Sequence, residues 1–530
     1  MNYIHYKKCD TIKMVAKQIG GLQVILGYIM MVPAVVSVIY SEYYSALGFV
    51  LSAGICLLVG FGLYKGIQPG IEPVKRHALI IAALGWLIVA VMGSLPFIII
   101  AWITPHNIAS AMIPHGSAYG MSSIYYFKNP LHAIFDSMSA YTTTGLSMAV
   151  HEPSIGRGLL FYRSFAQWTG GAGFIVLALA VLGQANGKTA MYLYGSETPG
   201  ERLKPTIIET ARSIWKAYLG VTLFSFVYLF IGTLIILPDY DISVNLFDSL
   251  NHAMNAQSTG GFSTLDDSIA GYNSKAMEML YVLPMVLGAL SLPFYFKLAN
   301  ERRLKIFWTN LQTRSIIIWS ILGSVILSLM LIKAGVVNDP FRIGIFQFVS
   351  ALSTTGWQTC DVHLWDSAPI FFISMAGMVV GGAAGATVGG LKIIRVLLIF
   401  KGLFWHINGY FSSSNSIKVV KFNEKRLLPL EMNSDLAMAA TFSFIYLLFI
   451  FISTIITYYL MDSGYTLKDA LFESASAQGT VGLSCGITHP GMNAGLEIMY
   501  VLQMWAGRLE IIPVLVLMRT LLFGTRPVIA

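Results

Sequence analysis

The sequence predicts an all-α integral membrane protein in which four similar units surround one axis and two further helices precede them. Three observations lead to this prediction. Hydrophobic residues make up 55% of the 530 residues and charged residues only 11%, less than half of the roughly 25% that is usual in soluble domains. Apolar stretches recur along the chain, and one short motif recurs four times among them. The net charge of +8 does not indicate nucleic-acid binding, because the basic residues lie in short blocks between apolar stretches.

Ten apolar stretches are long enough to cross a membrane, since a bilayer core of about 30 Å requires about 20 residues of helix. The first follows several lysines, as a signal peptide would, but it is long enough to span and no cleavage site follows closely. We therefore expect it to remain as the first helix. The ten stretches lie near residues 22–40, 47–64, 78–104, 160–184, 214–237, 277–296, 315–333, 369–400, 436–460 and 497–518.

Lysine and arginine are distributed unevenly between the connecting segments. If both termini are cytoplasmic, most of the 34 basic residues fall on the cytoplasmic side, as expected for cytoplasmic loops. The asymmetry predicts an even number of spans and an acidic outer face.

Four further apolar stretches are too short to span and end in small polar residues. They lie near 130–142, 246–257, 340–352 and 466–478. We expect them to be re-entrant, which requires surrounding protein or water to satisfy their backbone. Asn129 and Asp339, each before a proline, are expected to cap two of these helices. Thr466 and Asp469 resemble a capping box for the fourth.

Each short stretch ends in the pattern Ala-x-x-Thr-x-Gly-apolar-polar. The threonines are 116, 95 and 126 residues apart, so each unit contains a span, a re-entrant segment and a span. A pattern repeated four times is a strong signal. It predicts a two-helix segment at 1–76 and four units at 77–213, 214–312, 313–435 and 436–530. The residues at the centre of the motif are Thr143, Thr144, Gly145; Thr259, Gly260, Gly261; Thr354, Thr355, Gly356; and Thr480, Val481, Gly482.

These residue types suit a filter for a dehydrated monovalent cation. Main-chain carbonyls and threonine hydroxyls replace a hydration shell when four strands face one axis. Glycine permits the positive φ that turns a carbonyl inward, and each preceding helix directs its negative end toward the ion. The sequence therefore predicts a central pore. Because the middle residue differs between the strands, we expect its selectivity to be looser than that of four identical strands.

The eighth stretch contains a glycine-rich segment. Glycines four residues apart are typical of close helix packing, but each also lowers helix propensity by about 1 kcal/mol relative to alanine. We expect an unwound segment just below the filter that acts as a gate. A phosphate-binding loop is excluded because Gly390-Leu391-Lys392 lacks the Gly-Lys-Ser/Thr pattern. The expected gate consists of Gly381, Gly382, Ala383, Ala384, Gly385, Ala386, Thr387, Gly389 and Gly390.

The tenth stretch contains a charge, Arg508, which marks a functional position in a membrane segment. Glu510 is not expected to be its partner, because residues two apart on a helix do not face each other. In the cavity, the guanidinium would repel a cation by about 3 kcal/mol at roughly 5 Å. Alternatively, Arg508 bonds carbonyls of the glycine-rich segment, and the two roles are compatible.

These features together resemble the TrkH/TrkG membrane subunits of Trk-type potassium-uptake systems. The resemblance extends over essentially the whole chain and includes the four filter motifs, "RSFAQWTGGAG" at 163–173, "GGAAGATVGGLK" at 381–392 and "GRLE" at 507–510. It implies that the filter residues bind K⁺, that the glycine-rich segment is an intramembrane gating loop and that Arg508 lies beside it. It also implies a homodimer in the bacterial inner membrane and a cytosolic, nucleotide-binding TrkA-type ring subunit on the basic inner face. The third filter departs from the other three in its Trp357-Gln358, which leaves its selectivity open.

The expected function is K⁺ uptake driven by the membrane potential, which supplies about 2.3 kcal/mol per charge for each 100 mV. The alternative is a K⁺ symporter coupled to H⁺ or Na⁺. Glu510 is the only carboxylate assigned to a span, which argues against coupling. No catalytic constellation is apparent, since His132, His252, His363 and His489 are expected singly on the outer side. We therefore predict no enzyme activity. The chain has no dinucleotide fingerprint, so we expect no organic cofactor in it, and its four cysteines lack a paired-motif spacing, so neither a disulfide framework nor a zinc site is indicated.

Overall fold

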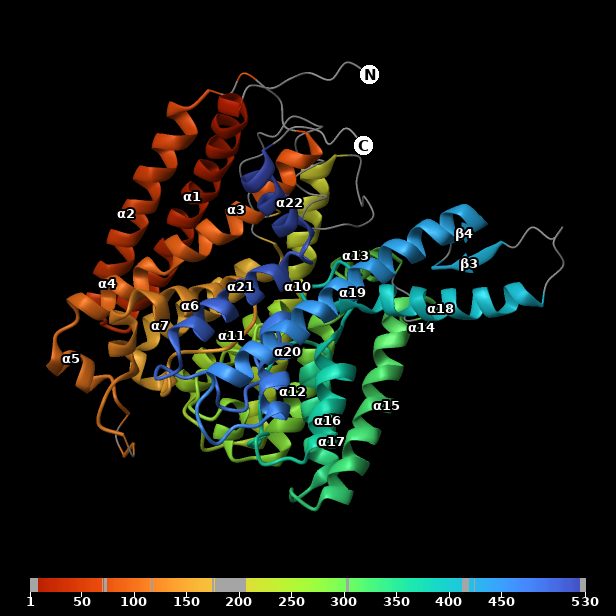
Figure 1. Ribbon diagram of the computed structural model, residues 1–530. Coiled ribbons are helices and arrows are strands. Elements are labelled where there is room, and N and C mark those ends of the chain that lie inside the picture. Colours follow the sequence, from red (N-terminus) through yellow and green to blue (C-terminus); the bar gives the residue numbers. More distant parts are fainter. Residues whose placement is uncertain are drawn as a thin grey trace.

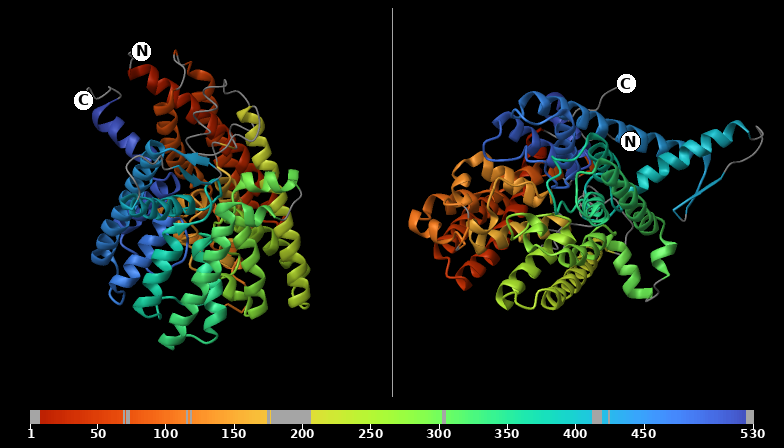
Figure 2. Two further views of the ribbon diagram at one scale, coloured as in Figure 1. Left: turned by 90° about the vertical axis from the view of Figure 1, so that its right-hand side faces the viewer. Right: turned by 90° about the horizontal axis from the view of Figure 1, so that it is seen from below.

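The computed structural model describes residues 8–524, apart from 69, 71–73, 115, 118, 174–175, 177–205, 302–304, 412–418 and 424. The described chain is mostly helical, with two short pairs of strands, and its helices form four sectors around a common axis (Figures 1 and 2). Helix α1 begins and helix α22 ends on the same face of the molecule, which we call the terminal face (Figure 1). This arrangement confirms the predicted membrane fold.

Two long helices precede the four units. Helices α1 (Lys8–Ile39) and α2 (Tyr43–Gly66) form a hairpin that packs against the first unit. Gly20 and Gly60 lie at their closest approach, where a Cβ atom on either residue would overlap the other helix. Small residues at such a crossing allow two membrane helices to pack closely.

The four units follow in sequence order. The first contains α3 (Lys75–Gly93), α4 (Leu95–Ile103), α5 (His106–Ala111), η1 (Ser123–Lys128), α6 (Pro130–Tyr141), η2 (Glu152–Ile155) and α7 (Arg157–Gly171). The second contains α10 (Ile207–Ile236), α11 (Ile242–Ser258), η3 (Ser268–Tyr272), α12 (Lys275–Gly288), α13 (Leu292–Glu301) and α14 (Ile306–Thr309). The third contains α15 (Leu311–Ala334), α16 (Pro340–Leu352), α17 (Ser367–Phe372), the π-helix η4 (Ile373–Met378), β1 (Val380–Gly381), β2 (Leu391–Lys392), α18 (Ile393–Tyr410), β3 (Val420–Phe422) and β4 (Lys425–Leu427). The fourth contains α19 (Pro429–Leu460), α20 (Leu467–Gly479), α21 (Ala494–Arg508) and α22 (Ile512–Phe523).

The ten predicted spans differ in continuity. Among the described residues, six helices are long and apolar enough to cross a membrane as they stand. The continuous helices expected near 277–296 and 497–518 are wrong, because α12 and α13 meet at 90° and α21 and α22 at 114°. The stretch near 369–400 is interrupted between η4 and α18, as the glycine-rich segment predicts. Most of the stretch near 160–184 beyond α7 lies outside the described residues. The number of crossings therefore stays a prediction.

The four short stretches form the helices α6, α11, α16 and α20, which point their C-terminal ends toward the centre. Asn129 caps α6 through the Leu131 N–H, and Thr466 and Asp469 form the predicted capping box of α20. The expected cap at Asp339 is wrong: its backbone has a φ of 59°, and its carboxylate pairs with Lys275 of the second unit.

The second long helix of each unit stops near the end of the short helix of the same unit. These helices end at Gly171, Gly288, Met378 and Arg508. Near each end a glycine packs against the short helix, at a distance that leaves no room for a Cβ atom. The four contacts are Gly170 on the Tyr141 carbonyl, Gly288 on the Ala256 carbonyl, Gly377 on the Ala351 side chain and Gly507 on the Gln478 carbonyl.

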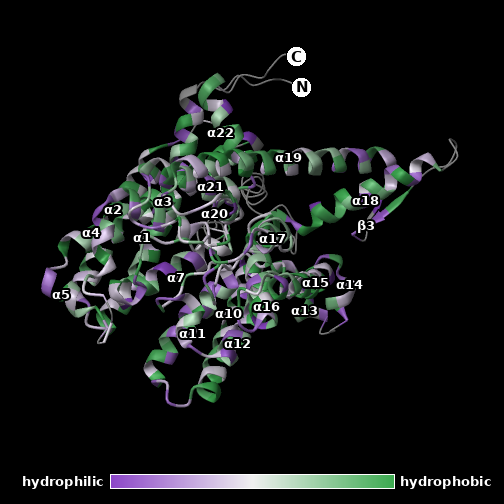
Figure 3. Ribbon diagram, turned by 60° about the horizontal axis from the view of Figure 1, so that its bottom comes forward, coloured by the Kyte–Doolittle hydropathy of each residue, from purple (hydrophilic) through white to green (hydrophobic). Residues whose placement is uncertain are grey.

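Helices α18 and α19 form an arm that protrudes from the sectors and carries the antiparallel β3–β4 hairpin near its end (Figures 1 and 2). Hydrophobic residues follow both helices along the arm (Figure 3). Many are exposed, including Phe400, Leu403, Phe404, Ile407, Phe444 and Phe451. Within the described chain, this face of the arm has no covering element.

Candidate ion pathway

The four motif segments close into a ring. A Cβ atom added to each motif glycine would overlap the carbonyl oxygen of the middle residue in the next segment. The pairs run in order around the ring: Gly145 with Gly260, Gly261 with Thr355, Gly356 with Val481, and Gly482 with Thr144. Because the fourth unit returns to the first, the segments surround one axis, and only glycine fits at these four positions.

The motif threonines adopt a left-handed backbone. The φ angles are 58° at Thr143, 55° at Thr259, 52° at Thr354 and 49° at Thr480, and the following glycines have φ between 77° and 97°. A left-handed conformation is a genuine outlier for a β-branched residue, and strain of this kind persists only where surrounding contacts impose it. All four threonines are fully buried. Sequence reasoning anticipated the positive φ of the glycines but not that of the threonines.

A polar residue four positions before each threonine, near the end of the short helix, forms hydrogen bonds with the motif segment of the same unit. In every unit its carbonyl accepts the N–H of the middle residue at 2.8–3.0 Å. In the first and fourth units its hydroxyl also accepts the motif glycine N–H, at 2.9 and 3.0 Å. In the second and third its side chain donates to the carbonyl of the residue after the glycine, at 2.6 and 2.8 Å. These residues are Ser139, Asn255, Ser350 and Ser476.

A second polar residue, seven positions before the threonine, contacts the residue five positions after it. The chemistry of this brace differs in each unit. Asp136 accepts the Met148 N–H at 2.6 Å, and Glu473 accepts the Cys485 N–H at 3.0 Å. His252 accepts the Thr264 N–H at 3.5 Å, and Gln347 lies 3.4 Å from the Thr359 hydroxyl. Asp136 is also paired with the buried Arg163 at 3.1 Å.

Gln167 of α7 supports the second segment, whose middle residue is Gly260. Its amide donates to the Gly260 carbonyl and accepts the Phe262 N–H at 3.2 Å. A Cβ atom at Gly260 would overlap this amide, so Gln167 occupies the space that the Thr144, Thr355 and Val481 side chains take in the other units. Gln167 lies in the "RSFAQWTGGAG" stretch, but sequence reasoning assigned it no role.

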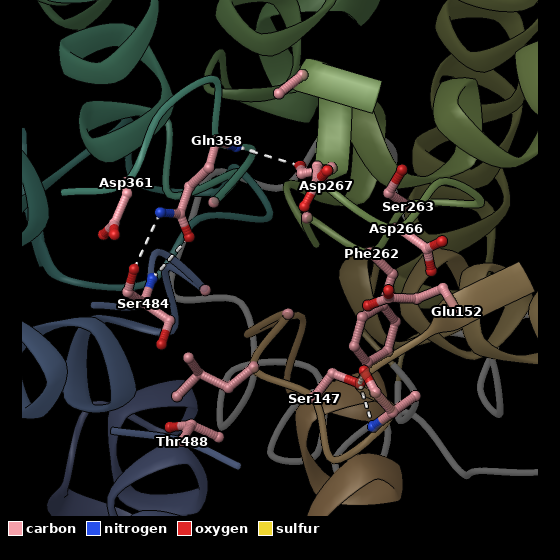
Figure 4. Close-up of a pocket in the computed structure, with 18 of the residues that line it drawn as sticks. Ser147, Glu152, Phe262, Ser263, Asp266, Asp267, Gln358, Asp361, Ser484 and Thr488 are labelled. Carbon is pink, nitrogen blue, oxygen red and sulfur yellow. Dashed lines mark hydrogen bonds between the residues drawn. The ribbon is translucent and has the colours of Figure 1, made fainter. Parts of the chain in front are cut away.

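A cavity of about 470 Å³ opens onto one side of the ring and is lined by all four motif glycines. We call it the vestibule. Glu152, Asp266, Asp267 and Asp361 contribute carboxylates to its wall, as Figure 4 shows. Burial, together with the neighbouring Asp266 and Asp136 carboxylates, raises the pKa of Glu152 to about 8, against the attraction of Arg163.

The glycine-rich loop lies against the other side of the ring. It begins and ends in the parallel β1–β2 pair, in which Val380 faces Leu391. The Thr387 hydroxyl lies 3.1 Å from that of Thr259, and the Gly389 N–H donates to the Thr354 hydroxyl at 3.2 Å. A Cβ atom at Gly389 would overlap the Thr480 hydroxyl. Loop residues therefore contact three of the four motif threonines.

Arg508 contacts the fourth motif threonine, Thr143. Its guanidinium lies 3.5 Å from the Thr143 hydroxyl and donates to the carbonyls of Gly170 and Gly171, at 2.7 Å each, and of Thr387 in the loop. The predicted contact with the glycine-rich segment is therefore present. Glu510 is not the partner of Arg508: it pairs with Arg395, the third residue of α18.

Known proteins are similar to this chain in sequence and fold. The family model described as TrkH, cation transport protein, matches residues 99–523. An uncharacterized cation transporter of Methanocaldococcus jannaschii is 32% identical over 509 residues, which cover 96% of this chain and 95% of that protein. The chain belongs to the TrkH family of cation transport proteins.

Other members and a solved structure agree with this assignment. The Trk system potassium uptake protein TrkG of Escherichia coli is 26% identical over 516 residues, covering 96% of this chain and 97% of that protein. The TrkH protein of Halomonas elongata is 29% identical over 401 residues, covering 74% of this chain and 75% of that protein. The crystal structure of the potassium transporter TrkH from Vibrio parahaemolyticus matches with a TM-score of 0.76 at 24% identity, covering 96% of this chain and 98% of that chain. The chain is thus a multi-pass membrane protein with the fold of this family.

The histidines on the vestibule side correct a sequence-based expectation for this family member. They were expected singly, but each has a partner. His132 lies 2.8 Å from Glu497, His363 lies 3.2 Å from Asp469, and His489 lies 3.0 Å from Asp462. His252 lies 2.8 Å from the Tyr281 hydroxyl. The His132–Glu497 and His363–Asp469 contacts each join two different units, so they connect neighbouring units at the periphery of the ring.

Proposed function

We propose that this chain carries K⁺ across a membrane through the ring formed by the four motif segments. The observation that carries the proposal is the closure of that ring, in which every glycine packs against the carbonyl of the next segment. Carbonyls brought together in this way replace the hydration shell of a dehydrated monovalent cation. The potassium uptake named for the Escherichia coli and Halomonas elongata relatives supports K⁺ as the ion.

The residues proposed to bind K⁺ are the twelve at the centre of the motif, from Thr143–Gly145 to Thr480–Gly482. The ends of α6, α11, α16 and α20 lie directly before them, so the negative ends of four helices face the ion. The carboxylates of the vestibule attract cations from solution. The bound ion is cargo, and these residues need no other cofactor to hold it.

The membrane potential supplies the driving force in this proposal. Each 100 mV contributes about 2.3 kcal/mol per elementary charge, which supports roughly fiftyfold accumulation. Two carboxylates near the pathway have cationic partners: the buried Asp136 pairs with Arg163, and the half-buried Glu510 with Arg395. This favours an uncoupled pore over symport with H⁺ or Na⁺.

The glycine-rich loop and Arg508 are proposed to be the gate, closed in this structure. Between them they contact all four motif threonines, so a cation leaving the ring would meet the loop and a guanidinium. Opening requires the loop to move away from the ring.

Partners and location are proposed from the family and from the surface. The terminal face is proposed to be cytoplasmic, in a bacterial inner membrane, and to receive a nucleotide-binding TrkA-type ring subunit that controls the loop. The exposed hydrophobic face of the α18–α19 arm supports the expectation of a homodimer, because a second copy would cover it.

The decisive experiment is ion flux in proteoliposomes that contain only this purified chain, under an imposed potential. K⁺, Rb⁺ and Na⁺ are compared at several pH gradients. We expect potential-driven K⁺ uptake that is independent of the H⁺ and Na⁺ gradients. Uptake that requires one of these gradients would support the symporter instead, and uptake of Na⁺ as fast as K⁺ would contradict the proposed selectivity.

A further inference from the structure

We propose that Glu510 is a positioning residue: its ion pair with Arg395 holds the glycine-rich loop against the ring. This inference rests on the proposed function only in so far as the loop is the gate. It assigns a role to the one carboxylate in the "GRLE" segment, which the ion pathway itself leaves unused.

Arg395 connects the ion pair to the end of the loop. It lies three residues after Lys392, the last residue of β2, so its backbone continues directly from the loop. Its guanidinium pairs with the Glu510 carboxylate and stacks on the Phe442 ring of α19 at 4.8 Å. Pairing with an ionised partner makes this a strong type of hydrogen bond. The pair therefore ties the beginning of α18 to the break between α21 and α22.

The same break holds the loop at a second point. Arg508, two residues before Glu510, donates to the Thr387 carbonyl in the middle of the loop. Gly507 fixes the position of the break relative to the ring, because it packs against the Gln478 carbonyl at the end of α20. One short segment thus contacts the middle of the loop through Arg508, and through Glu510 it binds Arg395, three residues after the end of the loop.

The break has a strained backbone. Glu510 has a φ of 54° and Ile511 a φ of 69°, and the left-handed region is unfavourable for a β-branched residue such as Ile511. Strain of this kind is typical of segments that switch between conformations. Releasing the ion pair removes one of the contacts that hold this conformation, and α22 begins directly after it, at Ile512. The segment 508–511 therefore couples α22 to the loop.

A cavity gives the loop room to move. It has a volume of about 360 Å³ and is lined on one side by Ala384, Gly385, Ala386 and Val388 of the loop. Arg395, Phe442, Arg508 and Glu510 line it as well. The ion pair thus stands at the edge of the space into which the loop would withdraw.

The test measures the position of the loop directly. Ala386→Cys is introduced into a protein whose four native cysteines are replaced by serine, and its reaction with a water-soluble maleimide is followed in detergent. We expect Glu510→Gln and Arg395→Gln each to increase the labelling rate about tenfold, which is the change that loss of 1.4 kcal/mol produces in a two-state equilibrium. The charge-exchanged variant with Arg395→Glu and Glu510→Arg should return the rate toward the parent value.

The matched control is Glu278→Gln. Glu278 forms a comparable ion pair with Arg342 between α12 and α16, remote from the loop. The Glu278→Gln substitution should lower the unfolding midpoint without changing the labelling rate of the Ala386→Cys position. If Glu510→Gln and Arg395→Gln behave like this control, the ion pair is only structural and the inference is wrong.

Flux separates this inference from the proposed function. Faster labelling together with faster potential-driven K⁺ flux supports both. Faster labelling with unchanged flux supports the positioning role of Glu510 and contradicts the loop as the gate.

Discussion

Gly145 shows why single residues of the ring cannot be exchanged. Its φ is 97°, and a side chain would overlap the Gly260 carbonyl of the neighbouring segment. Two independent constraints, backbone conformation and space, therefore select glycine at this position. The same holds for its three counterparts.

The change Gly145→Ser should distort the carbonyl ring and reduce the discrimination of K⁺ from Na⁺. Each 1.4 kcal/mol lost from the difference in binding free energy between the two ions lowers the discrimination about tenfold. The permeability ratio in proteoliposomes measures this effect. Gly54→Ser is the matched control, because no atom lies within 4 Å of a Cβ built at Gly54 in α2. An unchanged ratio in Gly145→Ser would contradict the assignment of the ring as the filter.

Glu152 makes the vestibule sensitive to pH. Because its pKa is raised to about 8, its carboxyl is mostly neutral at pH 7 and becomes charged as the pH rises through about 8. The added negative charge should attract cations to the mouth, so K⁺ uptake from dilute solution should increase between pH 7 and pH 9.

Rates of K⁺ uptake at low and saturating K⁺, measured across this pH range, test the prediction. Glu152→Gln should abolish the rise at low K⁺ and leave the saturating rate unchanged. A rise that persists in Glu152→Gln would have to come from another group.

Among the elements, the second helices carry the functional asymmetry of the four units. All four stop beside the short helix of their own unit. After α12 and after α21 the chain turns sharply into another helix, whereas after η4 it leads into the loop. The short helices and ring segments, by contrast, repeat nearly the same backbone hydrogen bonds. In the proposed function, selectivity therefore resides in the features that the units share, and gating in those that differ.

Replacement of Arg508 by alanine should raise basal K⁺ flux. A guanidinium about 5 Å from a cation repels it by about 3 kcal/mol at an effective dielectric constant near 20, which is roughly a hundredfold in occupancy. Arg508→Lys retains the charge but cannot reproduce the several carbonyl contacts of a guanidinium. Flux that stays low in Arg508→Lys and rises in Arg508→Ala would identify the charge as the barrier. A folded Arg508→Ala protein without increased flux would show that Arg508 only supports the loop.

On the scale of the complete fold, the ring exists only when all four units assemble. Each unit supplies one segment, and side-chain contacts such as His132–Glu497 and His363–Asp469 join neighbouring units outside the ring. Carbonyl oxygens that converge on one axis repel one another until a cation lies between them. Binding of the selected ion should therefore stabilise the assembled protein.

K⁺ should accordingly raise the unfolding temperature more than Na⁺ at equal ionic strength. A ligand at a hundred times its dissociation constant stabilises the folded state by about 2.7 kcal/mol. Thermal unfolding in detergent with K⁺, Rb⁺, Na⁺ or choline measures this difference without any need for the gate to open. Equal unfolding temperatures in K⁺ and choline would argue against an ion site in the ring, and Gly145→Ser should reduce the K⁺ effect.

Local chemistry was sufficient to predict much of this protein from its sequence. Apolar length located the long helices, proline and capping residues located three of the short ones, and the motif repeated four times located the ring segments. These features depend on residues that are near one another in the chain. The break in the eighth stretch was predictable for the same reason, because its glycines weaken a helix wherever they are placed.

Tertiary contacts decided the rest. The sharp turns after Gly288 and Arg508 occur in stretches that were each predicted as one apolar span. A proline follows each turn, Pro293 and Pro513, and the packing of Gly288 and Gly507 against the short helices fixes where the two helices end. Surrounding contacts also impose the left-handed backbone of the motif threonines. The support of Gly260 by Gln167 and the pairing of Glu510 with Arg395 join residues that are close in space but distant in sequence. Periodicity and propensity describe one segment at a time, whereas a ring and the loop against it are contacts between segments, which form only when the four units meet.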